Sequence, residues 1–220
     1  MSAAPPALPA AALFDWDNTL VDTWPVIHDA MNATLAAMGH PLWTLEETRA
    51  RVRLALREAF PALFGDRWLE ARDIYYARFR AIHLDRLAAM PGAEALLAAM
   101  AGRGIHLGVV SNKSGDHLRR EARHLGWDRY FARLVGATDA RRDKPALEPV
   151  ALALDGSGVA SGPKVWFIGD TEIDLECAHN AGCVKVLVRE IPPSDGEFIS
   201  FPPDLYFPGC RELETLVSRL

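Results

Sequence analysis

Cysteine is scarce in this chain, and no long hydrophobic run is present. The three cysteines, Cys177, Cys183 and Cys210, form an odd set without a CxxC spacing, which argues against a disulfide framework and a zinc site. We therefore expect buried thiols in a reducing cytoplasm. The apolar N-terminal stretch has no basic residue before it and is interrupted by Asp15, so it predicts neither a signal peptide nor a membrane span. We expect residues 1–9 to be a flexible lead-in.

An excess of positive charge is also lacking. The formal net charge is −5, which gives no reason to expect a nucleic acid polymer or an anionic membrane as partner. Hydrophobic residues make up 50% of the 220 residues, as in an ordinary soluble globular protein of one domain, or of one domain with a smaller inserted one. Small molecules are the expected partners, and the sequence leaves the oligomeric state open.

Short apolar segments of strand length recur along the chain and end in polar residues. They lie at residues 11–15, 106–112, 133–139, 165–170 and 184–190. From the second onward, segments with helical patterns separate them. This alternation predicts an α/β fold with a doubly wound parallel sheet and right-handed crossovers.

The gap between the first two strand segments is too long for one crossover. Residues 23–88 show helical periodicity instead, and Thr44 with Glu47 fits a capping box that opens a helix over residues 44–60. We therefore expect an all-helical cap over residues 23–88. The core into which it is inserted would consist of residues 10–22 and 89–220.

Two aspartates spaced one residue apart follow the first predicted strand. Asp15 and Asp17 point to the same side of an extended chain, because side chains alternate along a strand. Two such carboxylates can bind a hard cation, or one can attack a substrate while the other transfers protons. Taken alone, the pair fits a solvated turn as well.

Polar residues follow three further strands. Ser111 and Asn112 stand between a strand end and a helix start, where they can hold a phosphate oxygen or merely cap the helix. Lys144 precedes Pro145, and proline suits the first position of a helix, so the lysine can point back at the sheet edge. A lone lysine is otherwise usually solvated.

Asp170 and Asp174 follow the fourth strand and reach the same side if a helix starts there. A turn with Asp170 as helix N-cap is the alternative. Ligands of a doubly wound sheet bind where the carboxyl ends of the strands meet, and carboxylates gathered there repel one another unless positive charge is present. Lys144 and a divalent cation would supply it, and Mg²⁺ suits an all-oxygen site that a phosphoryl group completes.

In this order, the segments LFDWDNT, VVSNK, RRDKP and GDTEID resemble the motifs of the haloacid dehalogenase superfamily, and within it the phosphoglycolate-phosphatase-like hydrolases. The resemblance runs from residue 12 to the C-terminus and departs from the family pattern at Asn18, where glycine is common. It implies a doubly wound core with a helical cap inserted after the first motif. It also implies a cytoplasmic Mg²⁺-dependent phosphatase that acts on a small phosphate monoester, such as phosphoglycolate, a sugar phosphate or a nucleotide.

The resemblance implies a role for each charged motif residue. Asp15 would be the nucleophile that forms an aspartyl-phosphate, and Asp17 the general acid and then the general base. Asp170 would bind Mg²⁺ beside Asp15 and the backbone carbonyl of Asp17. Asp174 would support the ion through water, and Lys144 would neutralise charge between the nucleophile and the phosphate.

The resemblance also places phosphate contacts and sorts the reaction classes. Thr19 and Ser111 would hold phosphate oxygens, with the backbone of Asn112 assisting. Relatives that cleave carbon–halogen bonds lack the second carboxylate, so Asp17 argues against dehalogenation. Phosphonate-cleaving relatives need a cap lysine, and residues 20–90 contain none. A phosphomutase of the β-phosphoglucomutase kind shares all the motifs and stays an alternative, with a non-catalytic binding protein of the same fold ranked below it.

Arginines in the predicted cap are the candidate contacts to the leaving group. A helix over residues 44–60 puts Arg49, Arg53 and Arg57 on one stripe, which is typical of a solvated helical face as well as of a substrate clamp. We expect Arg53 to lie near the family's substrate-specificity loop and to bind an anionic leaving group, such as a carboxylate.

Overall fold

The computed structural model describes residues 6–52 and 56–220. The chain forms two compact units. The first unit is made of two chain segments, one that ends at Val21 and one that begins at Ala89. The second unit consists of the segment between them, Asp22–Ala88.

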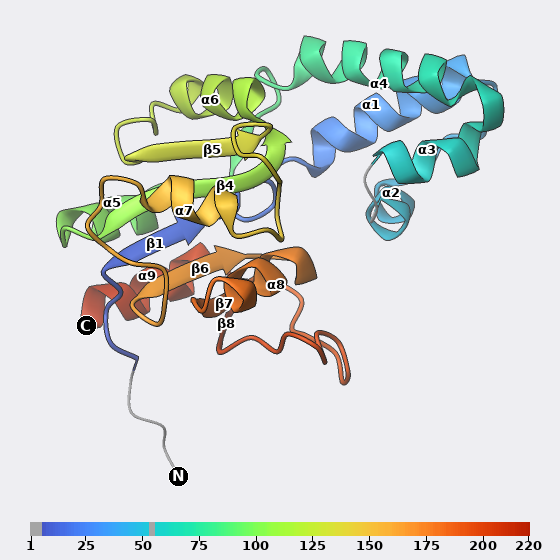
Figure 1. Ribbon diagram of the computed structural model, residues 1–220. Helices are drawn as coiled ribbons and strands as arrows, with labels where there is room; N and C mark the ends of the chain where they lie inside the picture. The colour runs from blue at the N-terminus through green and yellow to red at the C-terminus, as the bar shows by residue number, and fades with distance from the viewer. Residues whose placement is uncertain (1–5, 53–55) are drawn as a thin grey trace. The chain divides into compact units, whose positions relative to one another are not determined.

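A six-stranded parallel sheet forms the centre of the first unit (Figure 1). Its strands are β1 (Ala11–Phe14), β4 (His106–Ser114), β5 (Arg133–Ala137), β6 (Val165–Gly169), β7 (Val184–Val188) and β8 (Leu205–Phe207). Their order is β5-β4-β1-β6-β7-β8, and neighbours run parallel. The doubly wound parallel sheet predicted from the sequence is confirmed, with β8 as an added edge strand that the pattern did not predict.

Helices cover both faces of this sheet. They are α5 (Ala93–Gly102), α6 (Gly115–His124), α7 (Glu148–Leu154), α8 (Glu172–Asn180) and α9 (Cys210–Arg219). Figure 1 shows α7 and α8 on one face of the sheet and α5 and α9 on the other. Leu13 of β1 belongs to the hydrophobic core under α7 and α8, whereas Phe14 packs edge-on against Phe131. Side chains alternate along the strand, so Asp15 continues the Leu13 side and Trp16 the Phe14 side.

The strand order places the predicted motifs of Asp15 and Asp170 where the order of strands along the chain reverses. The chain runs from β1 to β4 and β5 on one side, and then returns to β6, β7 and β8 on the other. The carboxyl ends of β1 and β6 therefore form the topological switch point, where open α/β sheets bind ligands. Asp15 follows β1 directly, and Asp170 follows β6.

The second unit is helical, which confirms the predicted insertion. It contains α1 (Trp24–Ala37), α2 (Leu45–Arg51), α3 (Leu56–Phe64), the 3₁₀ helix η1 (Gly65–Arg67) and α4 (Trp68–Ile82). Buried residues of α1, α3 and α4, including Leu35, Phe60 and Tyr75, form its own hydrophobic core. None of the helices within residues 6–52 and 56–220 is long and apolar enough to cross a membrane.

The predicted continuous helix over residues 44–60 is wrong. Thr44 and Glu47 do form the expected capping box, with each side chain accepting from the other residue's backbone N–H. However, α2 ends at Arg51, because the backbone of Val52 leaves the helical region with ψ of 78° and its side chain packs against the core of this unit. Packing of this partly buried apolar side chain outweighs the local preference for helix at this position.

Two short strands mark the places where the chain leaves the sheet unit and returns to it. β2 (Val21–Asp22) and β3 (Ala88–Ala89) form a two-stranded sheet. Beside them, the Met90 N–H donates to the Leu20 carbonyl at 2.9 Å. The two crossings between the units are therefore adjacent.

Candidate active site

A buried ion-pair network lies at the carboxyl end of β1. The Asp15 backbone N–H donates to the Ile168 carbonyl of β6 at 2.8 Å, which fixes the residue beyond the strand end. Lys144 Nζ donates to Asp15 Oδ1 and to Asp174 Oδ1, at 2.7 Å each. The Lys144 side chain is only 3% exposed, so it is not the solvated lysine of the alternative interpretation. Three residues far apart in the sequence thus meet at one sheet edge.

Asp170 completes a cluster of carboxylates. One oxygen each of Asp15, Asp170 and Asp174 lies within 4.8 Å of the others. The hydroxyl of the fully buried Thr19 donates to Asp170 Oδ1 at 3.0 Å. The prediction that Thr19 holds a phosphate oxygen therefore stays a prediction, while its observed contact orients Asp170. Carboxylate oxygens in this number and spacing are the donors that a hard divalent cation prefers.

The electrostatics of the cluster favour such a cation. The pKa of Asp15 is raised to about 6, chiefly because the carboxyl group is buried; Lys144 opposes this rise, and the carboxylates of Asp174 and Asp17 contribute to it. Burial also raises the pKa of Asp170 well above its ordinary value, with Asp174 and Asp15 adding to the effect. Lys144 sets one positive charge against three carboxylates, so a divalent ion would offset the remaining repulsion. The residues present fit Mg²⁺.

The first turn of α8 fixes Asp174. Thr171 is the helix N-cap, and its N–H and hydroxyl donate to Asp174 Oδ2 at 3.0 and 2.7 Å. Because Lys144 binds the other oxygen, Asp174 suits a supporting role better than direct ligation. A Cβ on Gly169 would lie 2.3 Å from Asp174 Cβ, so only glycine permits this close approach. The helix N-cap is thus Thr171 and not Asp170, and the Thr-x-x-Asp spacing is the sequence signal for it.

The end of β4 contacts the segment that carries Lys144. The Asn112 side chain donates to the Lys144 carbonyl at 3.2 Å and accepts from the Lys144 N–H at 2.9 Å. The predicted role of the Asn112 backbone at the phosphate stays a prediction, and this clamp by its side chain was not foreseen. Ser111 is buried, and its Oγ accepts from the Lys113 N–H at 3.2 Å. The N-cap of α6 is Ser114, so Ser111 does not cap that helix.

Asp17 lies in a second charged network. Its Oδ1 accepts from Lys113 Nζ at 2.6 Å, and Lys113 Nζ also donates to Glu121 Oε2 at 2.7 Å. Trp16 Nε1 donates to the same oxygen of Glu121 at 2.7 Å. Asn18 follows with φ of 61°, a left-handed conformation that asparagine adopts more readily than most residues, so its departure from the glycine expected from the resemblance is compatible with this backbone. Lys113 and Glu121 were missed by the sequence reasoning.

The haloacid dehalogenase-like hydrolase family matches residues 12–188 of this chain. The chain belongs to this family. It is 34% identical over 195 residues to a phosphoglycolate phosphatase of Rhodospirillum rubrum, covering 82% of this chain and 80% of that protein. It is 31% identical over 182 residues to a phosphoglycolate phosphatase of Xanthomonas campestris, covering 81% and 82%. The solved structure of a haloacid dehalogenase-like family hydrolase from Streptococcus pneumoniae is similar, with a TM-score of 0.82 and 23% sequence identity. The match covers 97% of this chain and 99% of that one, and it shows the fold.

The cap arginines of this hydrolase do not share one helix. Arg49 lies in α2, where its guanidinium stands 5.9 Å from the centre of the Trp24 ring, and Arg57 belongs to α3. The predicted stripe on a single helix is therefore wrong. Arg53, the predicted contact to the leaving group, lies outside the described residues.

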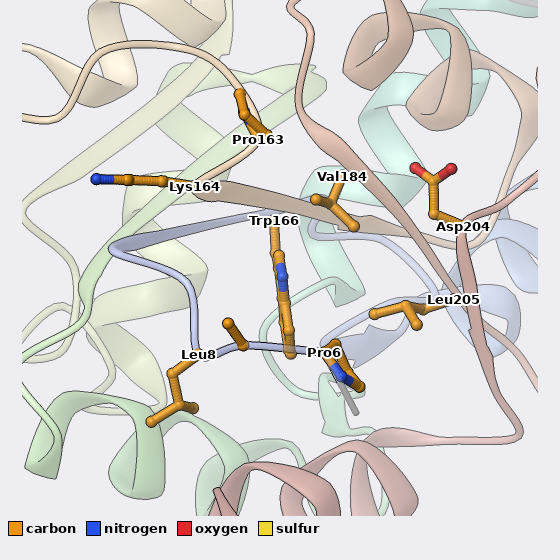
Figure 2. Close-up of a pocket in the computed structure, with 9 residues that line it drawn as sticks. Pro6, Leu8, Pro163, Lys164, Trp166, Val184, Asp204 and Leu205 are labelled. Carbon is orange, nitrogen blue, oxygen red and sulfur yellow. The ribbon is translucent and has the colours of Figure 1, made fainter. Parts of the chain in front are cut away.

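A cavity of about 340 Å³ lies elsewhere on the sheet unit of the hydrolase (Figure 2). Its lining includes Leu8, Trp166 and Leu205, and Figure 2 shows the Trp166 ring extending toward the segment at Leu8. Trp166 stands near the beginning of β6, whereas Asp170 follows the end of that strand. The cavity is thus at the opposite edge of the sheet from the carboxylates.

Proposed function

We propose that this protein is a Mg²⁺-dependent phosphatase that hydrolyses a small phosphate monoester through an aspartyl-phosphate on Asp15. The observation that carries the proposal is the contact of 2.7 Å between Lys144 Nζ and Asp15 Oδ1 inside a cluster of buried carboxylates. An anionic nucleophile needs positive charge beside it before a phosphate dianion can approach. Lys144 supplies that charge and holds the attacking carboxylate in place.

In the first step, a carboxylate oxygen of Asp15 attacks phosphorus and the bond from phosphorus to the ester oxygen breaks. The Asp17 carboxyl group gives its proton to the leaving oxygen, and the alcohol departs. Asp17 is then a carboxylate and takes a proton from water, whose oxygen attacks phosphorus. The bond to Asp15 breaks, inorganic phosphate leaves, and both side chains return to their starting states. Phosphoryl transfer of this kind depends on positioning and charge compensation.

When bound, Mg²⁺ would be held by Asp15, Asp170 and the Asp17 backbone carbonyl, and would supply positive charge for the phosphoryl oxygens. The chain's own groups complete the phosphate site. Ser111 is buried within β4, and we assign its hydroxyl and the Asn112 backbone to phosphate oxygens. We assign the Thr19 hydroxyl to a phosphate oxygen as well, which requires that its proton turn from Asp170 to the substrate.

The relatives support a substrate class, and the buried cysteines support a compartment. Relatives that are 31% and 34% identical are named phosphoglycolate phosphatase, which supports phosphoglycolate as the first ester to test. Sugar phosphates and nucleoside monophosphates complete the panel. All three cysteines are buried and free, which supports a cytoplasmic location.

The test is phosphate release from this panel with Mg²⁺, with EDTA, and by the variant Asp15→Asn. We expect release that EDTA abolishes and that Asp15→Asn lowers by about 10⁴-fold or more, because the variant lacks the nucleophile. Asp155→Asn is the matched control, since Asp155 is an exposed surface carboxylate paired with Arg133, and it should keep full activity. Arg53→Ala should raise KM for anionic esters if the predicted cap contact exists.

Full activity of Asp15→Asn would refute the nucleophilic role. Isomerisation of a sugar phosphate without release of phosphate would show a mutase instead. Activity that survives EDTA treatment would refute the requirement for the metal.

A further inference from the structure

The network at Asp17 contains two buried charges that the proposed chemistry does not use. The side chains of Lys113 and Glu121 are 5% and 1% exposed, whereas Asp17 is 28% exposed. A buried lysine and a buried glutamate are costly unless they are paired. Both are paired here, and the chain of contacts they form ends on Asp17.

We infer that Lys113 and Glu121 are positioning residues that hold the Asp17 carboxyl group in one place for both of its proton transfers. The inference rests on the proposed function, because it needs Asp17 to act as acid and base. Neither residue would touch the substrate. Each acts through the contacts that fix Asp17.

The geometry requires such a support because Asp17 stands where the regular strand has ended. β1 ends at Phe14, and Asn18 turns the backbone with φ of 61°. A partly exposed carboxylate in a turn has several rotamers available, and misplacement by about 1 Å can lower a rate about 100-fold. The contact of 2.6 Å with Lys113 Nζ favours one of these rotamers.

Glu121 connects this contact to a rigid part of the core. Trp16 is fully buried and packs edge-on against Trp127 and Phe131. Its indole N–H and the Lys113 ammonium both donate to Glu121 Oε2, at 2.7 Å each. Lys113 is therefore held by Glu121 of α6, and Glu121 is itself held by Trp16, two residues after β1. Asp17 is held by a group that cannot itself move freely.

The pairing also explains why a glutamate accompanies the lysine. Burial lowers the pKa of Lys113, but the carboxylates of Asp17 and Glu121 raise it by more, so the amine stays an ammonium. The negative charge of Glu121 balances this ammonium. The Lys113–Glu121 pair thus holds Asp17 by hydrogen bonding without placing an uncompensated positive charge beside the proton-transfer group.

The first experiment compares wild type with Lys113→Met on two kinds of ester. An alkyl phosphate needs a proton on its leaving oxygen, whereas nitrophenyl phosphate releases a stable anion without one. We expect kcat/KM to fall about 100-fold for the alkyl ester and less than about tenfold for nitrophenyl phosphate. Stopped-flow traces with nitrophenyl phosphate should show a burst of nitrophenolate, because attack by water still needs Asp17 as base.

Further variants separate positioning from stability. Lys113→Met/Glu121→Gln removes both charges and should regain the melting temperature lost in Lys113→Met, yet stay slow on alkyl phosphates. Lys113→Arg, which keeps a cationic donor, should recover part of the rate. Lys185→Met is the matched control, since Lys185 pairs with Asp204 away from the carboxylate cluster, and its kinetics should equal those of wild type.

Four results would overturn the inference. Equal losses on both esters with unchanged kcat and raised KM would show that Lys113 binds substrate. If the double variant recovered both the melting temperature and the activity on alkyl phosphates that Lys113→Met loses, Lys113 and Glu121 would have a purely structural role. A wild type that hydrolyses no phosphate ester would remove the proposed function itself and this role with it, whereas an active wild type with an unimpaired Lys113→Met variant would remove only this role.

Discussion

Mg²⁺ should raise the melting temperature of the metal-free protein, and the rise should be larger at about pH 7.5 than at about pH 5. The pKa of Asp15 is raised to about 6 by burial in the metal-free protein. A carboxyl group with a raised pKa binds its proton more tightly in the folded state than in the unfolded state. Its stabilising effect is therefore complete at low pH and is lost as the pH rises through about 6.

The size of the effect follows from the shift. Raising the pKa from 3.8 to about 6 corresponds to about 3 kcal/mol of stability lost at neutral pH, and the raised pKa of Asp170 acts in the same direction. Mg²⁺ at about 100 times its Kd restores about 2.7 kcal/mol, which for a chain of this size is a rise of about 5–11 °C. At about pH 5 the proton on Asp15 competes with the ion, so the rise should shrink to a few degrees.

The assay is thermal unfolding of EDTA-treated protein with and without MgCl₂ at both pH values. Asp170→Asn keeps an acceptor for the hydroxyl of Thr19 but removes one negative charge. Its metal-free form should melt above the metal-free wild type, and it should not respond to Mg²⁺. Asp155→Asn should respond as wild type does, because Asp155 lies in an exposed pair with Arg133. Identical melting curves in Mg²⁺ and EDTA at about pH 7.5, or a metal-free Asp170→Asn that melts lower than wild type, would refute this reasoning.

Two further substitutions test the support of the site. Asn112→Ala removes both hydrogen bonds to the Lys144 backbone. We expect the free energy of unfolding in urea to fall by about 2 kcal/mol and kcat for phosphate release to fall about tenfold. An unchanged kcat would show that Lys144 keeps its position without the Asn112 side chain. Gly169→Ala places a Cβ 2.3 Å from Asp174 Cβ. We expect the free energy of unfolding in urea to fall by about 1–3 kcal/mol and Mg²⁺ to raise the melting temperature less than in wild type. An unchanged free energy of unfolding would mean that α8 can shift without cost.

Five of the six strands of the sheet were predictable because their central residues are buried apolar side chains, whereas β8 is a short and only partly buried edge strand. Each predicted strand is an apolar run, which is the pattern of a parallel sheet covered by helices, and each run ends in a polar residue at the functional edge. The strands β2 and β3 were not predicted because a strand of two residues has no detectable periodicity. The helix break at Val52 was not predicted because it accompanies the packing of that partly buried side chain against the core of the helical unit, which local sequence does not encode.

The site was predictable where its residues stand next to strand ends, and not where they depend on packing between distant segments. Asp15, Lys144 and Asp174 were expected near one another, and the structure brings them within hydrogen-bond distance. Glu121, by contrast, lies in a helix rich in charged residues, where a buried glutamate looks like any solvated one. Its burial arises from contact with Trp16, 105 residues earlier in the chain, so no local pattern marks it.

The hydrogen bond from the Met90 N–H to the Leu20 carbonyl has a consequence for how proteins of this kind diversify. The helical unit begins and ends at neighbouring points of the sheet unit, so any inserted segment whose own ends lie close together can occupy the same place without stretching the strands. Replacement of that segment by gene recombination would leave the carboxylate cluster, which belongs to the sheet unit, in place. The helical insert and the carboxylate cluster can thus evolve at different rates within one polypeptide.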